Sequence, residues 1–143
     1  MKVLLFRTTA DLIDSESRAI LRKDFIEPHE KEYPFEEGRE DNFRSLFSEG
    51  FKDIDLSQYE NIVRVEVECL WDETSITPGS QVIEGKNAPF LFTLNGVASE
   101  FSDNGFFSKG GGVSSLSLRP ANPVDIGEIV ESKVKFRVLI CAK

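Results

Sequence analysis

The alternation of side chains from Ile62 to Trp71 constrains the fold of this chain more than any other feature of its sequence. Apolar side chains alternate there with Arg64, Glu66 and Glu68. Successive side chains of a strand point to opposite faces of a sheet, so this period of two predicts a strand with one buried and one solvated face. The buried face would carry Val63, Val65, Val67, Cys69 and Trp71.

A segment near the C-terminus repeats this pattern with the opposite charge. Val134, Phe136, Val138 and Ile140 alternate there with Lys133, Lys135 and Arg137. Opposite charges that face each other across an antiparallel pair contribute roughly 0.2–1 kcal/mol. We therefore expect the two strands to be neighbours, with Glu66 and Glu68 facing Lys133 and Lys135. The residues expected to be buried are Val63, Val65, Val67, Phe136 and Val138.

Turn signals divide the second half of the chain into further strands. The segments 89–94 and 97–101 flank Asn95-Gly96, which favours a hairpin because this dipeptide accepts the positive φ angles of a two-residue turn. Further turns are predicted at 102–105 and at 109–112, before a strand over 113–118. About six strands then follow one another at a spacing typical of sandwiches and barrels.

The first half of the chain has weaker signals. Residues 2–8 are predicted to form a strand. Residues 17–25 fit both a strand and a helical stripe, of which the helix is favoured. Residues 27–41 contain two prolines, a glycine and seven acids, which predicts an exposed loop.

A helix is predicted over 41–50. Asp41 would cap its N-terminus, and Gly50 would end it. One face of this helix would carry Phe43, Leu46 and Phe47.

These elements predict one domain with a mainly β (α+β) fold. The 143 residues, 40% apolar and with 12 phenylalanines, suffice for one core. We expect an antiparallel β-sandwich or barrel-like sheet of about six to eight strands, with one or two short helices in the N-terminal half. Residues 1–60 would form a mixed α/β portion and residues 61–143 the sheet.

The charge of the chain limits its partners. The formal net charge is −8, and residues 1–60 hold 15 acids against 9 bases. Binding to a nucleic-acid backbone or to an anionic membrane depends on Lys and Arg, so neither is expected. The sequence instead favours a basic protein partner or self-association. No signal peptide or membrane-spanning segment is visible, which predicts a cytoplasmic protein.

Residue types for chemistry are scarce, and neither a catalytic site, nor a metal site, nor a cofactor is predicted. His29 is the only histidine, and the two cysteines, Cys69 and Cys141, lie in predicted strands, where free structural thiols are expected. The glycines at 110–112 follow a lysine instead of preceding one, unlike a phosphate-binding loop. They are expected to form a flexible hairpin tip.

Two segments combine aromatic side chains with an exposed backbone. Tyr33 and Phe35 lie among the acids of 27–41, where they could anchor a basic partner. Phe106 and Phe107 adjoin Lys109 and the glycines, and on a strand one of these two rings would point away from the core. Both segments are expected to be more exposed than the sheet.

No family motif appears in these residues, and three hypotheses about function stay open. The favoured one is a non-enzymatic binding or assembly protein that acts through an acidic, aromatic-bearing surface, of the kind common among virus- and bacterium-encoded accessory proteins. The alternative is a protein that binds a small anionic or nucleotide-like ligand through Arg119 or Arg7, with Phe106, Phe107 or Trp71 for stacking. The third is a hydrolase that uses the carboxylates of Glu66 and Glu68.

Overall fold

The computed structural model describes residues 2–13, 16–72, 75–77, 80–82, 84–122 and 132–143. The one helical element is a single 3-10 turn at Phe47–Glu49 in this described part of the chain. The strands are β1 (Lys2–Ile13), β2 (Ile20–Phe35), β3 (Glu37–Leu46), β4 (Lys52–Asp53), β5 (Ile62–Trp71), β6 (Ser75–Thr77), β7 (Ser80–Val82), β8 (Phe90–Leu94), β9 (Glu100–Ser102), β10 (Phe106–Lys109), β11 (Leu116–Pro120) and β12 (Lys133–Ala142).

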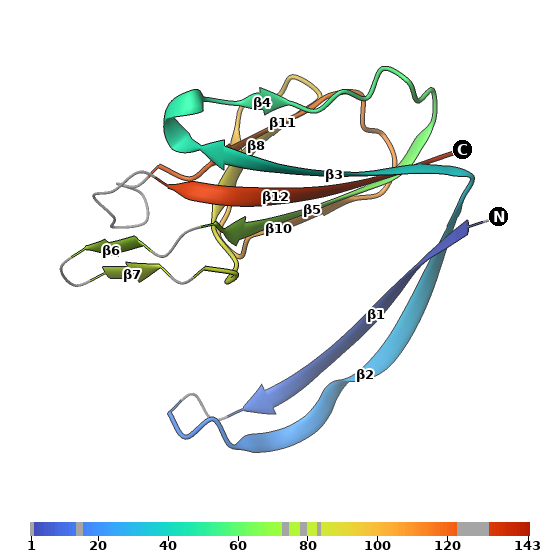
Figure 1. The fold of residues 1–143 in the computed structure, drawn as a ribbon. Coiled ribbons are helices and arrows are strands. Elements are labelled where there is room, and N and C mark those ends of the chain that lie inside the picture. Colours follow the sequence, from blue (N-terminus) through green and yellow to red (C-terminus); the bar gives the residue numbers. More distant parts are fainter. Residues whose placement is uncertain (1, 14–15, 73–74, 78–79, 83, 123–131) are drawn as a thin grey trace. The chain divides into compact units, whose positions relative to one another are not determined.

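The chain divides into two compact units, Met1–Glu36 and Glu37–Lys143. The first is a two-stranded antiparallel sheet of β1 and β2, which we call the ribbon. The second is the sandwich, in which two four-stranded antiparallel sheets pack together (Figure 1). Their strand orders are β10-β5-β12-β3 and β4-β11-β8-β9. The predicted mainly β, sandwich-like fold is therefore confirmed, whereas the expectation of a single domain stays a prediction.

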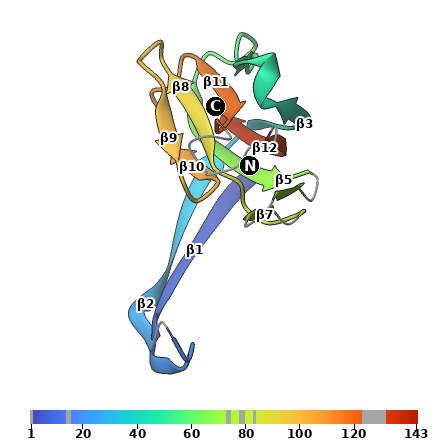
Figure 2. The same ribbon diagram turned by 90° about the vertical axis from the view of Figure 1, so that its left-hand side faces the viewer.

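The core of the sandwich lies between its two sheets (Figure 2). The alternating apolar residues of β5 and β12 point inward, and Val65, Val67, Phe136 and Val138 are fully buried, as predicted. Phe136 contacts Phe90 of the other sheet edge-to-face, with 5.5 Å between ring centroids. Aromatic side chains thus join the two layers.

The register between β5 and β12 differs from the predicted one. Glu68 lies opposite Arg137 and Glu66 opposite Leu139, whereas Lys135 lies opposite Leu70. The predicted pairing of the two glutamates with Lys133 and Lys135 is therefore wrong, because alternation determines which face a residue occupies but leaves the shift along the strand open. Val63, which was expected to be buried, is half-buried.

The helix predicted over 41–50 is wrong for most of its length. Residues 37–46 form β3, which pairs with β12 from Lys133 opposite Leu46 to Ala142 opposite Glu37. Phe43 fits this strand because its ring packs on Phe136 with centroids 5.4 Å apart. The long ladder outweighs the local helical pattern. Within residues 41–50, helical backbone is confined to Phe47–Glu49, and Gly50 follows it at a φ of 77°.

The predictions for residues 17–41 are also wrong. Residues 20–35 form β2 instead of a helix and an acidic loop, and β3 begins at Glu37. Pro34 is tolerated within β2, because a strand paired on one side leaves half of its backbone groups outside the ladder.

The Asn95-Gly96 turn is confirmed, since both residues have positive φ, 54° and 74°. Its second strand is shorter than predicted: β9 begins at Glu100, opposite Phe92. The strand expected over 113–118 begins later and is β11. No helix in the described residues combines the length and the apolar content that a membrane crossing needs.

Candidate binding surfaces

One face of the ribbon carries most of its aromatic side chains. Residues directly opposite each other in an antiparallel pair share a face, as do every second residue of a strand. The register pairs Lys2 with Phe35, Leu4 with Tyr33 and Phe6 with Lys31. These residues form the aromatic ribbon face, which consists of Lys2, Leu4, Phe6, Lys31, Tyr33 and Phe35.

Contacts among these side chains arrange the face. The rings of Phe6 and Tyr33 meet edge-to-face with centroids 5.5 Å apart. The Lys31 ammonium lies 5.2 Å from the centre of the Tyr33 ring, within the range of a cation–π contact. Tyr33 and Phe35, both predicted as binding residues, are half-buried. Lys2 and Lys31 are exposed and make this face positively charged.

The opposite face of the ribbon is apolar in part and acidic in part. Val3 and Leu5 are 47% and 38% exposed. The register places Pro34 and Glu32 beside them. Farther along, the Arg7 guanidinium donates to Glu30 with 2.9 Å between Nε and Oε1. The ribbon therefore has apolar side chains on both of its faces.

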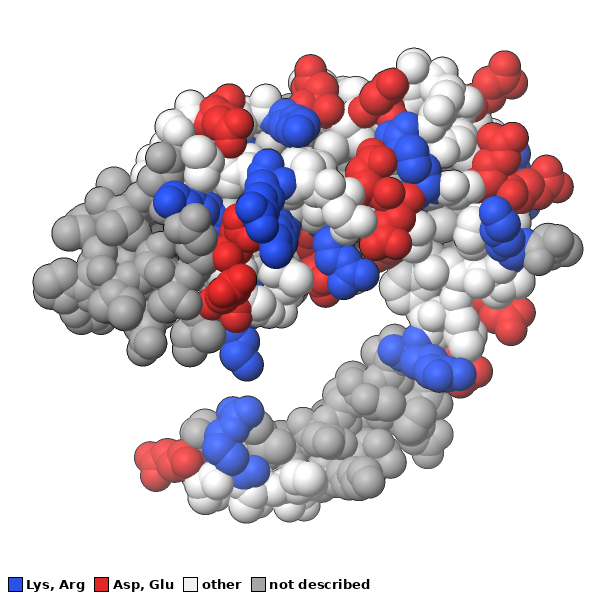
Figure 3. Space-filling view, in the orientation of Figure 1, with Lys and Arg blue, Asp and Glu red and all other residues white. Residues whose placement is uncertain are grey.

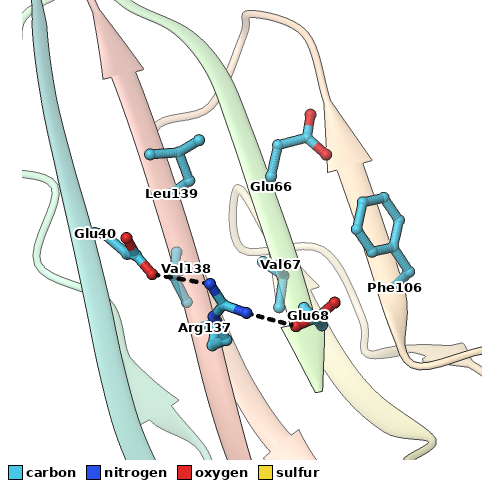
Figure 4. Close-up of a pocket in the computed structure, with 8 residues that line it drawn as sticks. All are labelled: Glu40, Glu66, Val67, Glu68, Phe106, Arg137, Val138 and Leu139. Atoms are coloured by element: carbon cyan, nitrogen blue, oxygen red, sulfur yellow. Dashed lines mark hydrogen bonds and ion pairs between the residues drawn. The ribbon is translucent and has the colours of Figure 1, made fainter. Parts of the chain in front are cut away.

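The outer face of the sheet β10-β5-β12-β3 holds a cavity of about 240 Å³. Acidic and basic side chains lie next to each other on this side of the molecule (Figure 3). Acidic and apolar side chains from β3, β5, β10 and β12 surround the cavity (Figure 4). We call this the glutamate cavity, and its side chains are Glu40, Glu66, Glu68, Phe106, Arg137 and Leu139.

Glu66 is the most buried carboxylate of the glutamate cavity, with 9% of its surface exposed. Its Oε1 accepts hydrogen bonds from the Arg64 Nε at 2.6 Å and from the Ser108 hydroxyl at 2.7 Å. Arg64 also donates to Ser108, which closes a network of three side chains. Glu66 Oε2 is buried and has no hydrogen-bond partner in the described residues.

The other two carboxylates share one arginine. The guanidinium of Arg137 reaches Glu68 at 3.3 Å and Glu40 at 3.4 Å from its two terminal nitrogens (Figure 4). All three side chains are partly exposed, so these ion pairs are weak. Arg64 balances Glu66, whereas Arg137 is shared by Glu40 and Glu68, so one negative charge remains in excess at the cavity.

The two phenylalanines of β10 have different surroundings. Phe107 packs against the core, and the centroid of its ring lies 4.2 Å from that of Phe92. Phe106 is 43% exposed and lines the glutamate cavity. The expectation that one ring points away from the core is therefore confirmed. Lys109, the third predicted binding residue of this segment, is exposed at the end of β10.

The arginines of the small-ligand hypothesis both have partners. Arg119 donates to the carbonyl oxygen of Phe47 from Nε at 3.0 Å and from Nη2 at 2.9 Å. Its guanidinium carbon also lies 3.8 Å from the centre of the Phe47 ring. Arg7 is paired with Glu30. These contacts give Arg119 a structural role beside the 3-10 turn.

Cys69 and Cys141 are free and buried, as predicted. Cys69 lies on β5 opposite Phe136, and Cys141 lies on β12 opposite Arg64. Arg64 is five positions from Cys69 along β5. At about 3.3 Å per residue, this shift is too long for a disulfide. Burial raises the pKa of both thiols, with smaller contributions from Glu68 at Cys69 and from Glu66 at Cys141.

A wider hollow lies beside β4 and β11, with a volume of about 650 Å³. Asp55 and Ser57 line it. The Ser57 hydroxyl and the Ser57 backbone N–H both donate to Asp55. These bonds, the hydroxyl bond most strongly, lower the pKa of that carboxyl. In the described part of the chain, no three His, Cys, Asp or Glu side chains are grouped as a metal would require.

Sequence reasoning named Glu66, Glu68 and Phe106 but not the cavity that they share, and it missed four of the six residues of the aromatic ribbon face. Glu66 and Glu68 were interpreted as a solvated face, but Leu139 occupies an outward position on β12 and indicates an apolar patch there. Similarly, Leu4 and Phe6 alternate with Val3 and Leu5, so both faces of the first strand are apolar. Such a pattern indicates a strand that is covered on both sides.

Comparison of the chain with protein-family models, with curated proteins and with solved structures finds no match.

Proposed function

We propose that this chain is a non-enzymatic assembly protein that associates with further copies of itself through its ribbon. The observation that supports this most strongly is that the ribbon has two strands and apolar side chains on both faces. An isolated two-stranded hairpin is at best marginally stable in water, and stability requires another layer or further strands.

The composition of the aromatic ribbon face supports an interface. Tyr33, Phe35 and Phe6 are of the residue types that anchor protein interfaces, because each offers a large apolar area with few rotatable bonds. Lys2 and Lys31 flank them as solvated charges. An interface with an aromatic centre and a charged rim has this arrangement.

A second copy is favoured as the partner because of charge. The aromatic ribbon face is positive, and the glutamate cavity of the sandwich is negative. One chain therefore carries two surfaces of opposite charge, which attract each other between copies in spite of the net charge of −8.

Sedimentation velocity over a wide range of protein concentrations tests this proposal. We expect the full chain to form a dimer or a larger species, and we expect the double variant Tyr33→Ala/Phe35→Ala to weaken association by more than ~1 kcal/mol. The matched control is Phe101→Ala, because Phe101 is 49% exposed on β9 in the other sheet.

Trp71 fluorescence confirms that each variant keeps a folded sandwich, since Trp71 packs against the core. A chain that stays monomeric at every concentration would contradict the proposal. An unchanged association of the double variant would contradict it equally.

A further inference from the structure

The unpartnered oxygen of Glu66 indicates that the glutamate cavity is a binding site. Oε1 is occupied by Arg64 and Ser108, whereas Oε2 is buried without a partner in the described residues. A buried acceptor without a donor is costly, and nearly all such groups in folded proteins are paired. A ligand that brings a donor to Oε2 would remove this cost.

The walls of the cavity determine which donor fits. Glu68 and Glu40 share the single positive charge of Arg137, which leaves one negative charge, so a cation is favoured over a neutral donor. Phe106 and Leu139 form an apolar wall beside the carboxylates. A lysine side chain matches both features, because it has an apolar stem and a compact ammonium with three donors.

We infer that the glutamate cavity receives Lys31 from the ribbon of a second copy, an inference that rests on the self-association proposed above. Lys31 lies across from Phe6 in the ribbon register and beside Tyr33 on the same face. Its ammonium therefore arrives together with aromatic rings. In the complex the Glu66 carboxylate turns so that Oε2, which is buried in the free chain, accepts from the ammonium, and the rings of Phe6 and Tyr33 cover Phe106 and Leu139.

Charge selects the aromatic face over the opposite face of the ribbon. Over residues 2–6 and 31–35, the aromatic face carries Lys2 and Lys31 and no acid. The opposite face carries Glu30 and Glu32 beside Arg7, and these carboxylates would be repelled by Glu66 and Glu68.

The contact joins two different surfaces of the chain. Such a heterologous contact closes into a ring or continues as an open filament, unless two copies exchange ribbons and form a closed dimer. In every case one ribbon and one cavity are used per contact.

Glu66→Gln tests the site with little change of shape. The amide oxygen of the new side chain can keep the hydrogen bonds from Arg64 and Ser108, which turns the amide NH₂ toward the cavity. A donor would then face the Lys31 ammonium. We expect association in sedimentation velocity to weaken at least about tenfold, as it does when one partner of a buried charge pair is lost.

Lys31→Glu tests the other half of the contact and is expected to weaken association by at least about as much. Two exposed residues outside both surfaces supply matched controls. Lys86→Glu changes the net charge as Lys31→Glu does, and Glu100→Gln changes it as Glu66→Gln does. Neither control should change association.

Mixing the two variants identifies the occupant. A Lys31→Glu chain keeps an intact cavity, and a Glu66→Gln chain keeps an intact ribbon. We expect the mixture to form a complex that contains both chains and is at least about tenfold tighter than the association of either variant alone. A mixture that associates no better than its components would overturn the second copy as the occupant.

The remaining outcomes separate this inference from the proposed function. If the wild-type chain associates and Tyr33→Ala/Phe35→Ala weakens it, but Glu66→Gln and Lys31→Glu do not, the ribbon assembles the protein at another surface and this inference is overturned alone. A wild-type chain that never associates overturns both.

Discussion

The ribbon and the sandwich are both antiparallel β-structure, but they use their apolar side chains differently. In the sandwich, Phe90 and Phe136 are fully buried between two sheets. In the ribbon, Val3 and Leu5 stay 47% and 38% exposed, and Tyr33 is half-buried. Strands alone therefore do not make a core, because a core needs a second layer.

This difference separates two sources of stability. The sandwich gains free energy from the area that its own sheets bury, at roughly 25 cal/mol per Å² of apolar surface. The ribbon has one layer of two strands, so the covering surface has to come from outside that unit. Its stability should then depend on association, whereas that of the sandwich should not.

The largest expected effect is the difference in stability loss when one phenylalanine of each region is replaced by alanine. Phe136→Ala should destabilise the sandwich by about 3–5 kcal/mol, because it leaves a cavity where the ring met Phe90 and Phe43. Phe6→Ala should change the unfolding of the sandwich by less than ~0.5 kcal/mol. Urea denaturation followed by Trp71 fluorescence, at a protein concentration below association, measures both values.

An equal loss of stability in the two variants would contradict this expectation, because Phe6 would then belong to the same cooperative unit as Trp71.

A smaller effect is expected at two glycines of the sandwich. Gly105 and Gly111 have similar positive φ values, 72° and 69°, so alanine at either costs about 1–2 kcal/mol of backbone strain. A Cβ at Gly105 would also lie 2.8 Å from the Ala88 carbonyl oxygen and 2.9 Å from that of Cys69. A Cβ at Gly111 meets nothing within 4 Å.

We therefore expect Gly105→Ala to be about 1–3 kcal/mol more destabilising than Gly111→Ala in the same denaturation assay. Equal losses would show that the backbone around Gly105 can move apart, and that the sandwich is less closely packed than its buried side chains indicate.

The sequence predicts the sandwich better than the ribbon, for a physical reason. In β5 and β12, alternation coincides with burial, so Val65 and Phe136 could be assigned to the core from their period alone. In β2, apolar, acidic and proline residues follow one another without a clear period, since no core selects one face. The composition of β2 therefore resembles that of a loop, and only its pairing with β1 shows that it is a strand.

The sites follow the same logic. Tyr33, Phe35 and Phe106 could be proposed from sequence because an aromatic side chain in a polar segment needs an explanation. The glutamate cavity could not, since it depends on the register that places Glu68 opposite Arg137 and Glu66 opposite Leu139. A shift of two residues keeps the same faces and would bring other side chains together.

Amide hydrogen exchange as a function of protein concentration follows the ribbon and the sandwich in one sample. If the ribbon is stabilised by association, amides within residues 3–7 and 30–33 gain protection as the concentration rises, whereas amides of β5 and β12 are equally protected throughout. Ribbon amides whose protection is the same at every concentration would contradict stabilisation by association.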